Sequence, residues 1–387
     1  MNETAARNSP AARIDWQAWA RLVRLPNVFT IIADISAAFF LVLGTGVTLS
    51  GAAPGSPLAS LPLTDPPEMN SYMPGVPVWV MLLCAVTSGV LLYWGGMVLN
   101  DVFDVEQDTL AERERPLVNG DLSVATARKA GWGLLAFGLV PTLLIGLITS
   151  FGTASEASSI GLQTMWSPLA IAAILAVLVV LYDGPCKRTP LAPILMGGCR
   201  VFSFLLGVTA ANAAIGDLAN TPLQAMRLGP TVIGDIRSVA LMFAIGMGTY
   251  IAGLTTFGRR EATGEATIHL PLGLLMMLAG GALLTFAPHF GGELAEGVSL
   301  ANLWQVDPTI VFPTAILLML AGTIFHGRRA VVSPSPAKIQ ATIRSGLLAI
   351  IPIAATITML SVGAFWAITV FALMVPSRIL AQRIRMT

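Results

Sequence analysis

Charge, histidine and cysteine are scarce in this chain of 387 residues. Charged residues make up 11% of it, against about a quarter in soluble domains, which excludes a water-soluble domain. The 22 basic and 21 acidic residues nearly cancel, so this balance gives no indication of a nucleic-acid partner. Three widely spaced cysteines and three dispersed histidines form neither a disulfide framework nor a zinc-binding pattern. The chemistry of the chain therefore has to come from a few charged residues in an apolar background.

Apolar residues, by contrast, make up 55% of the chain, and its mean hydropathy is +0.76. Windows of about 20 residues, the length of a membrane-crossing helix, predict nine spans. The predicted fold class is all-α, a polytopic membrane protein. The last span is long for one crossing and contains Pro352 and Pro376, so we expect it to be tilted, kinked or partly interfacial. The spans lie near residues 28–48, 78–99, 127–149, 165–182, 191–214, 236–257, 269–288, 308–325 and 345–376.

The chain divides into an amino-terminal tail with a helix, residues 1–27, and a transmembrane domain, residues 28–387. A polar tail with Glu3 and Asp15 precedes the first span, which argues against a cleaved signal peptide. Apolar residues at helical spacing within residues 14–25, beside tryptophan and arginine, are typical of a helix that lies in the membrane interface. An extension of the first span explains the same pattern equally well.

Basic residues are distributed unevenly between the predicted loops. The tail and the loops after the even-numbered spans carry most of the 22, and the loops after spans one, three and seven carry none. By the positive-inside rule, the amino terminus and the even-numbered loops face the cytoplasm, as in a multi-pass protein of the cell's inner membrane. Three arginines near the carboxyl terminus contradict a count of nine crossings, because an odd number of crossings places that terminus outside the cell. They are Arg378, Arg383 and Arg385.

Carboxylates gather where the second span ends, in the segment N-D-V-F-D-V-E-Q-D over residues 100–108. On a continuous helix, Asp101, Asp104 and Asp108 lie at i, i+3 and i+7 and share one face. Such a cluster repels itself unless a cation joins it, and Mg²⁺ binds through a few carboxylates together with substrate phosphates. The pattern predicts a catalytic Mg²⁺ site for a diphosphate. A solvated acidic helix end is the alternative, although acidic residues at a membrane border are usually functional.

The segment at residues 100–108 has the complete pattern N-D-x-x-D-x-x-x-D, and three shorter segments accompany it. They are R-x-x-N at residues 24–27, R-P-L-x-N-G at 115–120, and a tyrosine followed by a proline and a basic pair within 182–188. Together with the nine predicted spans, these motifs resemble the UbiA superfamily of intramembrane prenyltransferases. The asparagine in R-P-L-x-N-G stands where that family usually has serine.

The resemblance implies a UbiA-like helical bundle with its active site on the cytoplasmic side. It implies a prenyl diphosphate as one substrate and an aromatic or other lipid-soluble acceptor as the second. Tyr182 would line the site near the reacting cation, although a tyrosine of the interfacial aromatic belt fits the position at least as well. The resemblance also implies that Asn27, Asn100 and Arg115 contact substrate.

The loop after the sixth span departs from the family pattern, because Glu261 and Glu265 stand where many members have aspartates. The two glutamates keep the i, i+4 spacing and could ligate a second Mg²⁺. Alternatively, Arg259 and Arg260 bind phosphate oxygens directly, as guanidinium groups do. A third interpretation is an ordinary basic loop that only sets the topology.

The predicted reaction is the Mg²⁺-dependent transfer of a prenyl group through an allylic cation. Metal ions and basic residues would stabilise the departing diphosphate, with Lys187 and Arg188 beside the loop arginines as candidates. Asp34, inside the first span, is either a contact for the acceptor or a protonated carboxyl that bonds a neighbouring helix. A non-catalytic prenyl-lipid binder and a secondary transporter are the alternative functions.

Overall fold

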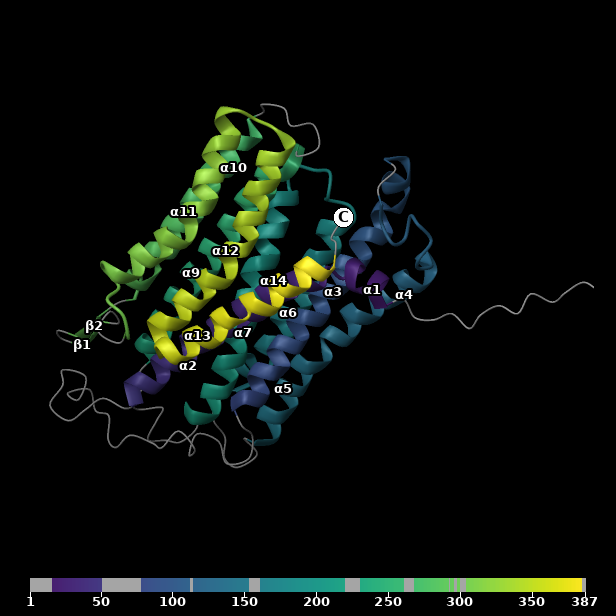
Figure 1. The fold of residues 1–387 in the computed structure, drawn as a ribbon. Helices are drawn as coiled ribbons and strands as arrows, with labels where there is room; N and C mark the ends of the chain where they lie inside the picture. The colour runs from purple at the N-terminus through teal and green to yellow at the C-terminus, as the bar shows by residue number, and fades with distance from the viewer. Residues whose placement is uncertain are drawn as a thin grey trace, which may run out of the picture.

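The structure is a computed structural model in which nine segments of the chain are described. They are residues 16–50, 78–111, 114–152, 161–219, 230–260, 268–291, 293–295, 298–299 and 304–384. Helices dominate these segments (Figure 1). One small antiparallel hairpin pairs β1 (Glu293–Ala295) with β2 (Val298–Ser299).

The first half of the chain contributes the helices that surround the acidic motif. They are α1 (Trp16–Leu22), the 3₁₀ turn η1 (Leu25–Asn27), α2 (Val28–Ser50), α3 (Val78–Leu110), α4 (Val124–Gly138), α5 (Val140–Gly152), α6 (Gly161–Asp183) and α7 (Ala192–Ala219). The second half contributes α9 (Pro230–Phe257), η4 (Gly258–Arg260), α10 (His269–Phe286), η5 (Ala287–His289), α11 (Val311–Val332), α12 (Pro336–Val362), α13 (Ala364–Ala372) and α14 (Met374–Arg383).

Ten helical stretches among the described residues are long and apolar enough to cross a membrane, so the prediction of nine spans is corrected. The error lies in the last predicted span, residues 345–376. Helix α12 ends at Val362, and Gly363 has φ 85°, a left-handed conformation that glycine adopts without steric cost. The chain turns back there, and residues Ala364–Arg383 form the tenth stretch, which runs diagonally across the bundle as α13 and α14 (Figure 1).

The tenth stretch returns to the end of the bundle where the first one begins. The Ser377 hydroxyl of α14 donates a hydrogen bond of 2.9 Å to the Pro26 carbonyl of η1, across 351 residues of sequence. Arg378 and Arg383 therefore lie toward the same end as the basic residues of the amino-terminal region. An even number of stretches removes the conflict with the basic-residue distribution; Arg385 lies outside the described residues.

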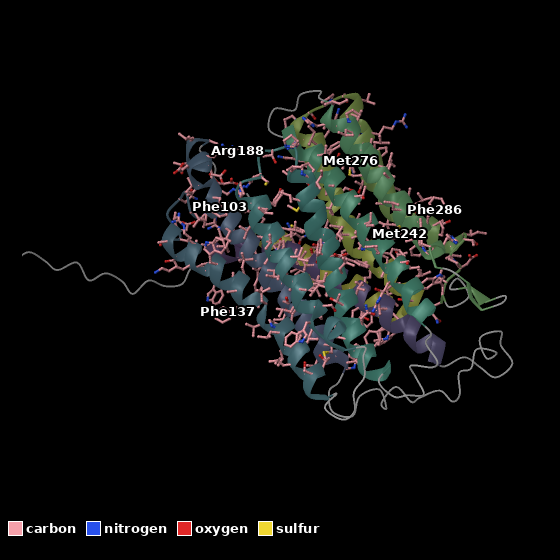
Figure 2. All side chains as sticks on the ribbon, turned by 180° about the vertical axis from the view of Figure 1, so that it is seen from behind. Phe103, Phe137, Arg188, Met242, Met276 and Phe286 are labelled. Carbon is pink, nitrogen blue, oxygen red and sulfur yellow. The ribbon has the colours of Figure 1, made fainter. Side chains whose placement is uncertain are left out.

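The bundle buries α2 at its centre and exposes apolar side chains at its periphery. Phe39, Phe204 and Phe243 are fully buried in the core, while Phe137 and Phe286 are 67% and 60% exposed. Figure 2 shows these last two on the outer surfaces of their helices. Apolar side chains on the outside are typical of a protein whose surrounding solvent is lipid. The chain is thus a multi-pass membrane protein.

Helices α9 and α10 approach closely through glycines spaced seven residues apart on each helix. Gly253 faces Gly273, and Gly246 faces Gly280. A Cβ on Gly280 would lie 2.5 Å from the Tyr250 nitrogen and 2.8 Å from the Gly246 oxygen. Both of these are backbone atoms that cannot turn aside, and close packing through small residues is a main source of helix association in membranes.

We expect Gly280→Ala to destabilise the protein by about 1–3 kcal/mol, because the new methyl group forces the two backbones apart. Gly133→Ala is the matched control, since a Cβ on Gly133 in α4 would meet nothing within 4 Å. Thermal denaturation of both variants in the same detergent measures the difference. Equal midpoints for the two variants would contradict the predicted clash.

Candidate functional site

The acidic motif lies on the last turns of α3, which continues without a break to Leu110. Its 33 residues make a helix of about 50 Å, longer than the roughly 30 Å hydrocarbon core of a bilayer. The excess length carries residues 100–108 beyond the apolar part of the helix. Asp101 and Asp108 are nonetheless buried, because the segment after α3 and the helix α1 cover them.

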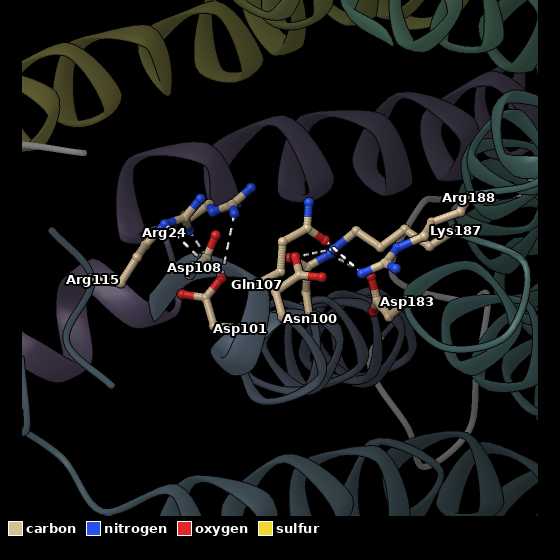
Figure 3. Close-up of polar contacts among 10 residues, drawn as sticks. Arg24, Asn100, Asp101, Gln107, Asp108, Arg115, Asp183, Lys187 and Arg188 are labelled. Carbon is tan, nitrogen blue, oxygen red and sulfur yellow. Dashed lines mark hydrogen bonds and ion pairs between the residues drawn. The ribbon is translucent and has the colours of Figure 1, made fainter. Parts of the chain in front are cut away.

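Two arginines cover one side of the motif (Figure 3). The Arg115 Nη1 donates a hydrogen bond of 3.0 Å to Asp101 Oδ1, and its Nε lies 3.7 Å from Asp108 Oδ2. The Arg24 Nη2 lies 3.5 Å from the same oxygen of Asp101. One arginine thus connects two carboxylates of the motif, and a second arginine also pairs with Asp101.

Arg24 has an unusual backbone conformation. Its φ of 48° and ψ of 53° are left-handed, and it is the one non-glycine residue with a positive φ among those described. This conformation costs roughly 1–2 kcal/mol for an ordinary residue. It separates α1 from η1 and α2, so the helix before the first span is not an extension of that span. It also turns the Arg24 side chain toward Asp101.

The segment between α6 and α7 covers the other side of the motif. Lys187 Nζ pairs with Asp104 Oδ2, and Arg188 Nη2 donates a hydrogen bond of 2.7 Å to Gln107 Oε1. Both contacts connect residues more than eighty positions apart in the sequence. The basic pair expected to bind phosphate therefore lies directly against the acidic helix, as Figure 3 shows.

Asp183 belongs to this site, although the sequence analysis did not select it. Its Oδ1 accepts a hydrogen bond of 2.8 Å from Asn100 Nδ2, and the residue is buried at the end of α6. Gly96 of α3 lets α6 approach closely beside Asp183, since a Cβ there would lie 2.7 Å from Val179 Cγ1. Its position directly after Tyr182, in the segment compared with the family, was the available signal.

A cavity of about 940 Å³ opens beside these residues. The charged residues that line it are Arg24, Asp104, Asp108, Asp183, Lys187, Arg188, Arg200 and Arg259. Arg200 lies deeper in the cavity and pairs with the buried Asp34, so four basic side chains face three acidic ones at the mouth. This excess of positive charge suits a phosphate-bearing ligand. Away from this charged mouth the wall becomes apolar, with Ile31, Leu92, Leu175, Ile251 and Ile350 from five different helices.

The residues predicted from the sequence fall into three groups. Those that line the cavity are Asn27, Asp104, Asp108, Tyr182, Lys187, Arg188 and Arg259. Asn100, Asp101 and Arg115 lie behind this wall and contact residues that form it or stand next to it. Glu261 and Glu265 lie outside the described residues, as does the side chain of Arg260.

The η4 turn, which precedes the loop with the two glutamates, reaches the same cavity. The Arg259 Nη2 donates a hydrogen bond to the Thr189 carbonyl in the segment between α6 and α7. Gly258 and Arg259 line the cavity opposite the acidic helix. The loop after the sixth predicted span therefore begins at the mouth of the site.

Among the described residues, no group of three histidine, cysteine, aspartate or glutamate side chains is close enough to form a complete metal site. Mg²⁺ does not require one, because it keeps waters and binds through one or two carboxylates plus substrate phosphates. Asp104 and Asp108 offer carboxylate oxygens at the cavity wall, and Asp183 offers a third. This hard-oxygen donor set fits Mg²⁺ bound together with a diphosphate.

A model of the UbiA prenyltransferase family matches residues 71–262, which include α3, the acidic motif and the segment between α6 and α7. Over these residues, just under half of the chain, the protein is similar to the UbiA prenyltransferase family. The resemblance inferred from residues 100–108 is thereby confirmed.

Curated relatives agree with this assignment. The chain is 31% identical to digeranylgeranylglyceryl phosphate synthase of Sulfolobus acidocaldarius over 143 residues, which are 37% of this chain and 42% of that protein. It is 29% identical to the synthase of the same name from Methanopyrus kandleri over 192 residues, 47% of this chain and 60% of that protein. The matched part thus spans less than two thirds of either relative.

A solved structure also resembles this one, described as the apo structure of a UbiA homolog from Aeropyrum pernix K1. The two share 16% sequence identity and superpose with a TM-score of 0.45, over 84% of this chain and 96% of that chain.

We expect Arg115→Met to destabilise the protein by about 3 kcal/mol, because it leaves buried carboxylates without their main partner. Arg188→Met is the matched control: Arg188 is exposed and bonds a neutral amide, so a change of at most about 1 kcal/mol is expected. Adding Asp101→Asn to Arg115→Met should recover part of the loss. Denaturation in detergent measures all three, and no recovery in the double variant would contradict the pairing.

Proposed function

We propose that this protein is an integral-membrane prenyltransferase. It transfers a prenyl group from an isoprenoid diphosphate to a lipid-soluble acceptor, in a Mg²⁺-dependent reaction that passes through an allylic cation. The match to the prenyltransferase family supports the reaction class, and the synthases to which the chain is similar are named for a prenylated lipid product. The proposed class of acceptor is a lipid-soluble molecule.

One observation carries the proposal: a single cavity joins a charged mouth to an apolar interior. An isoprenoid diphosphate has the same division, with several negative charges at one end and a hydrocarbon tail at the other. The basic residues at the mouth match the diphosphate, and the aliphatic side chains of α2, α3, α6, α9 and α12 match the tail. A transporter's ion site would instead be expected near the middle of the bilayer, in broken helices.

One or two of the cavity carboxylates Asp104, Asp108 and Asp183 would hold Mg²⁺ with the diphosphate. Asp101 would set the position of the motif through its arginine contacts. When bound, the metal neutralises charge that develops on the departing diphosphate. Lys187 and Arg188 lie on the same face and would bind the oxygens that the metal does not reach. The ion pair between Lys187 and Asp104 keeps both side chains at the mouth before substrate enters.

The chemical step breaks the bond between C1 of the prenyl group and the diphosphate oxygen, whose electron pair leaves with the diphosphate. The allylic cation then accepts an electron pair from the acceptor, which loses a proton. Tyr182 lines the cavity next to Asp183 and would place an aromatic ring near the cation. The apolar wall excludes the water that would otherwise capture the cation.

The loop after η4 would complete the diphosphate site. Arg259 at the mouth supports this proposal, because the loop that follows it carries Arg260, Glu261 and Glu265. The glutamates would hold a second Mg²⁺, or the arginines would bind phosphate directly. A higher Mg²⁺ requirement in Glu261→Gln would favour the metal, whereas weaker substrate binding in Arg260→Ala at unchanged Mg²⁺ demand would favour the arginines.

The mouth would face the cytoplasm of a cell whose inner membrane holds the protein. The supporting observation is the position of α14 beside η1, which brings the basic residues of both regions to the end of the bundle that carries Asp104. Residues 1–27 would form a cytoplasmic tail with a helix on the membrane surface, and residues 28–387 the catalytic domain.

We expect Asp104→Asn to reduce Mg²⁺-dependent release of diphosphate by at least roughly a hundredfold, the scale of losing one electrostatic contact to a transition state. Asp101→Asn should have a similar effect on turnover. The assay uses purified protein, prenyl diphosphates of graded length and a lipid extract as the acceptor source. Asp121→Asn is the control, because Asp121 pairs with Arg21 at the surface. Native rates in both site variants would contradict the proposal.

We expect a cysteine placed at Asp121 to resist labelling by an impermeant maleimide in intact cells, because that surface would face the cytoplasm. The experiment starts from a variant in which Cys84, Cys186 and Cys199 are replaced by alanine. A cysteine at Thr309, near the start of α11, provides the opposite control and should label readily. Rapid labelling at Asp121 with protection at Thr309 would reverse the orientation.

A further inference from the structure

A second polar group lies inside the cavity, away from the acidic motif. Arg200 of α7 is 6% exposed and lines the cavity wall. Its Nε lies 3.1 Å from Asp34 Oδ2, and its Nη2 donates a hydrogen bond of 2.9 Å to the Thr30 carbonyl. Asp34 is fully buried and stands behind the arginine, within α2. The guanidinium is thus held by two contacts, one with the buried Asp34 and one with the backbone of α2.

Other hydrogen-bonding groups surround Arg200 at the same level. Ser203, one turn further along α7, is 4% exposed, and its hydroxyl has no hydrogen-bond partner among the described residues. Tyr93 of α3 is a further hydroxyl-bearing residue at the cavity wall. Ser203 and Tyr93 both line the cavity. Buried polar groups normally have partners, so an unpartnered hydroxyl at a cavity wall indicates a ligand.

This polar group is distinct from the diphosphate mouth. Arg200 lies eight residues along α7 from Ala192, about 12 Å in a helix. Tyr93 precedes Asp104 by eleven residues on α3, or about 16 Å. Apolar side chains, among them Met97 and Met196, line the cavity between the two levels. Along both helices, Arg200 and Tyr93 thus lie more than two turns from the segments that carry the charged mouth.

The charge of Arg200 is already matched. Asp34 carries one negative charge and Arg200 one positive charge, so the pair presents N–H donors to the cavity without a net charge. A carboxylate or phosphate placed there would lie near the buried Asp34 carboxylate without a cation of its own. A carbonyl or hydroxyl oxygen accepts the same hydrogen bonds without that repulsion.

We propose that Arg200 and Ser203 bind an uncharged oxygen-bearing group, a carbonyl or a hydroxyl, on the prenyl acceptor. Asp34 is a positioning residue that orients the guanidinium and cancels its charge. The inference rests on the proposed function in one respect, the identification of the bound molecule as the prenyl acceptor. The preference for a neutral oxygen over an anion is a property of binding alone. The subsite thus selects among acceptors by charge before any chemical step.

The test compares two probes with the same ring and different charge, 2-acetylnaphthalene and 2-naphthoate. Binding to the full-length protein in detergent is followed by probe fluorescence, with Mg²⁺ and inorganic diphosphate present to fill the charged mouth. The native protein should bind the ketone saturably and at least roughly tenfold more tightly than the carboxylate. Arg200→Gln should weaken ketone binding by roughly tenfold or more, the scale of one hydrogen bond to a charged group.

The decisive variant is Asp34→Asn, which keeps the shape of the side chain and removes its charge. Arg200 then has an unmatched positive charge, and the preference should shift toward 2-naphthoate by roughly tenfold or more. Asp121→Asn, the same substitution at a surface position, should leave the preference unchanged. Ser203→Ala should weaken ketone binding by a few fold, and it avoids the risk that an arginine variant does not fold.

An unchanged preference in a folded Asp34→Asn protein would overturn the proposal, as would the absence of saturable ketone binding to the native protein. Neither result would affect the proposed transfer reaction, which diphosphate release measures separately. Conversely, the native protein could prefer the ketone over the carboxylate and yet release no diphosphate. That result would overturn the proposed function and leave the subsite as a binding site for neutral oxygen.

Discussion

Carboxylates at the border of a membrane cannot remain near one another without positive partners, and this requirement organises the mouth of the cavity. Arg115 connects Asp101 and Asp108, and Lys187 pairs with Asp104. Those partners come from different connecting segments, so the charge balance of α3 determines where each segment lies. The mouth therefore has a defined shape before any ligand is present, which is the preorganisation that electrostatic catalysis needs.

Close helix packing supplies the complementary requirement, a dry interior. Gly253 and Gly273 bring α9 against α10, and Gly96 lets α6, which ends at Asp183, approach α3. Small residues thus serve two purposes: they hold the outer helices together, and they let polar groups reach the cavity from neighbouring helices. A membrane protein has little hydrophobic driving force between its helices, so such contacts contribute much of its packing energy.

The sequence predicted the general plan well because hydropathy and helical spacing are local properties. Residues 100–108 indicated a continuous helix with one acidic face, and α3 continues through them. Spacing along a helix could not predict its rotation, so the position of Asp101 behind the cavity wall and the contact of Asn100 with Asp183 were missed. The reversal at Gly363 was missed as well, because apolar residues continue on both sides of it and a left-handed glycine leaves no trace in hydropathy.

The bond between Ser377 and Pro26 has a consequence for the order of assembly. Chains are synthesised from the amino terminus, so the η1 turn enters the membrane long before its partner on α14 exists. The strained Arg24 next to η1 acquires this support only when almost all of the protein has been made. A truncated product that lacks α14 would keep every aspartate of the motif. It would lack the hydrogen bond from Ser377 that holds η1 next to Arg24.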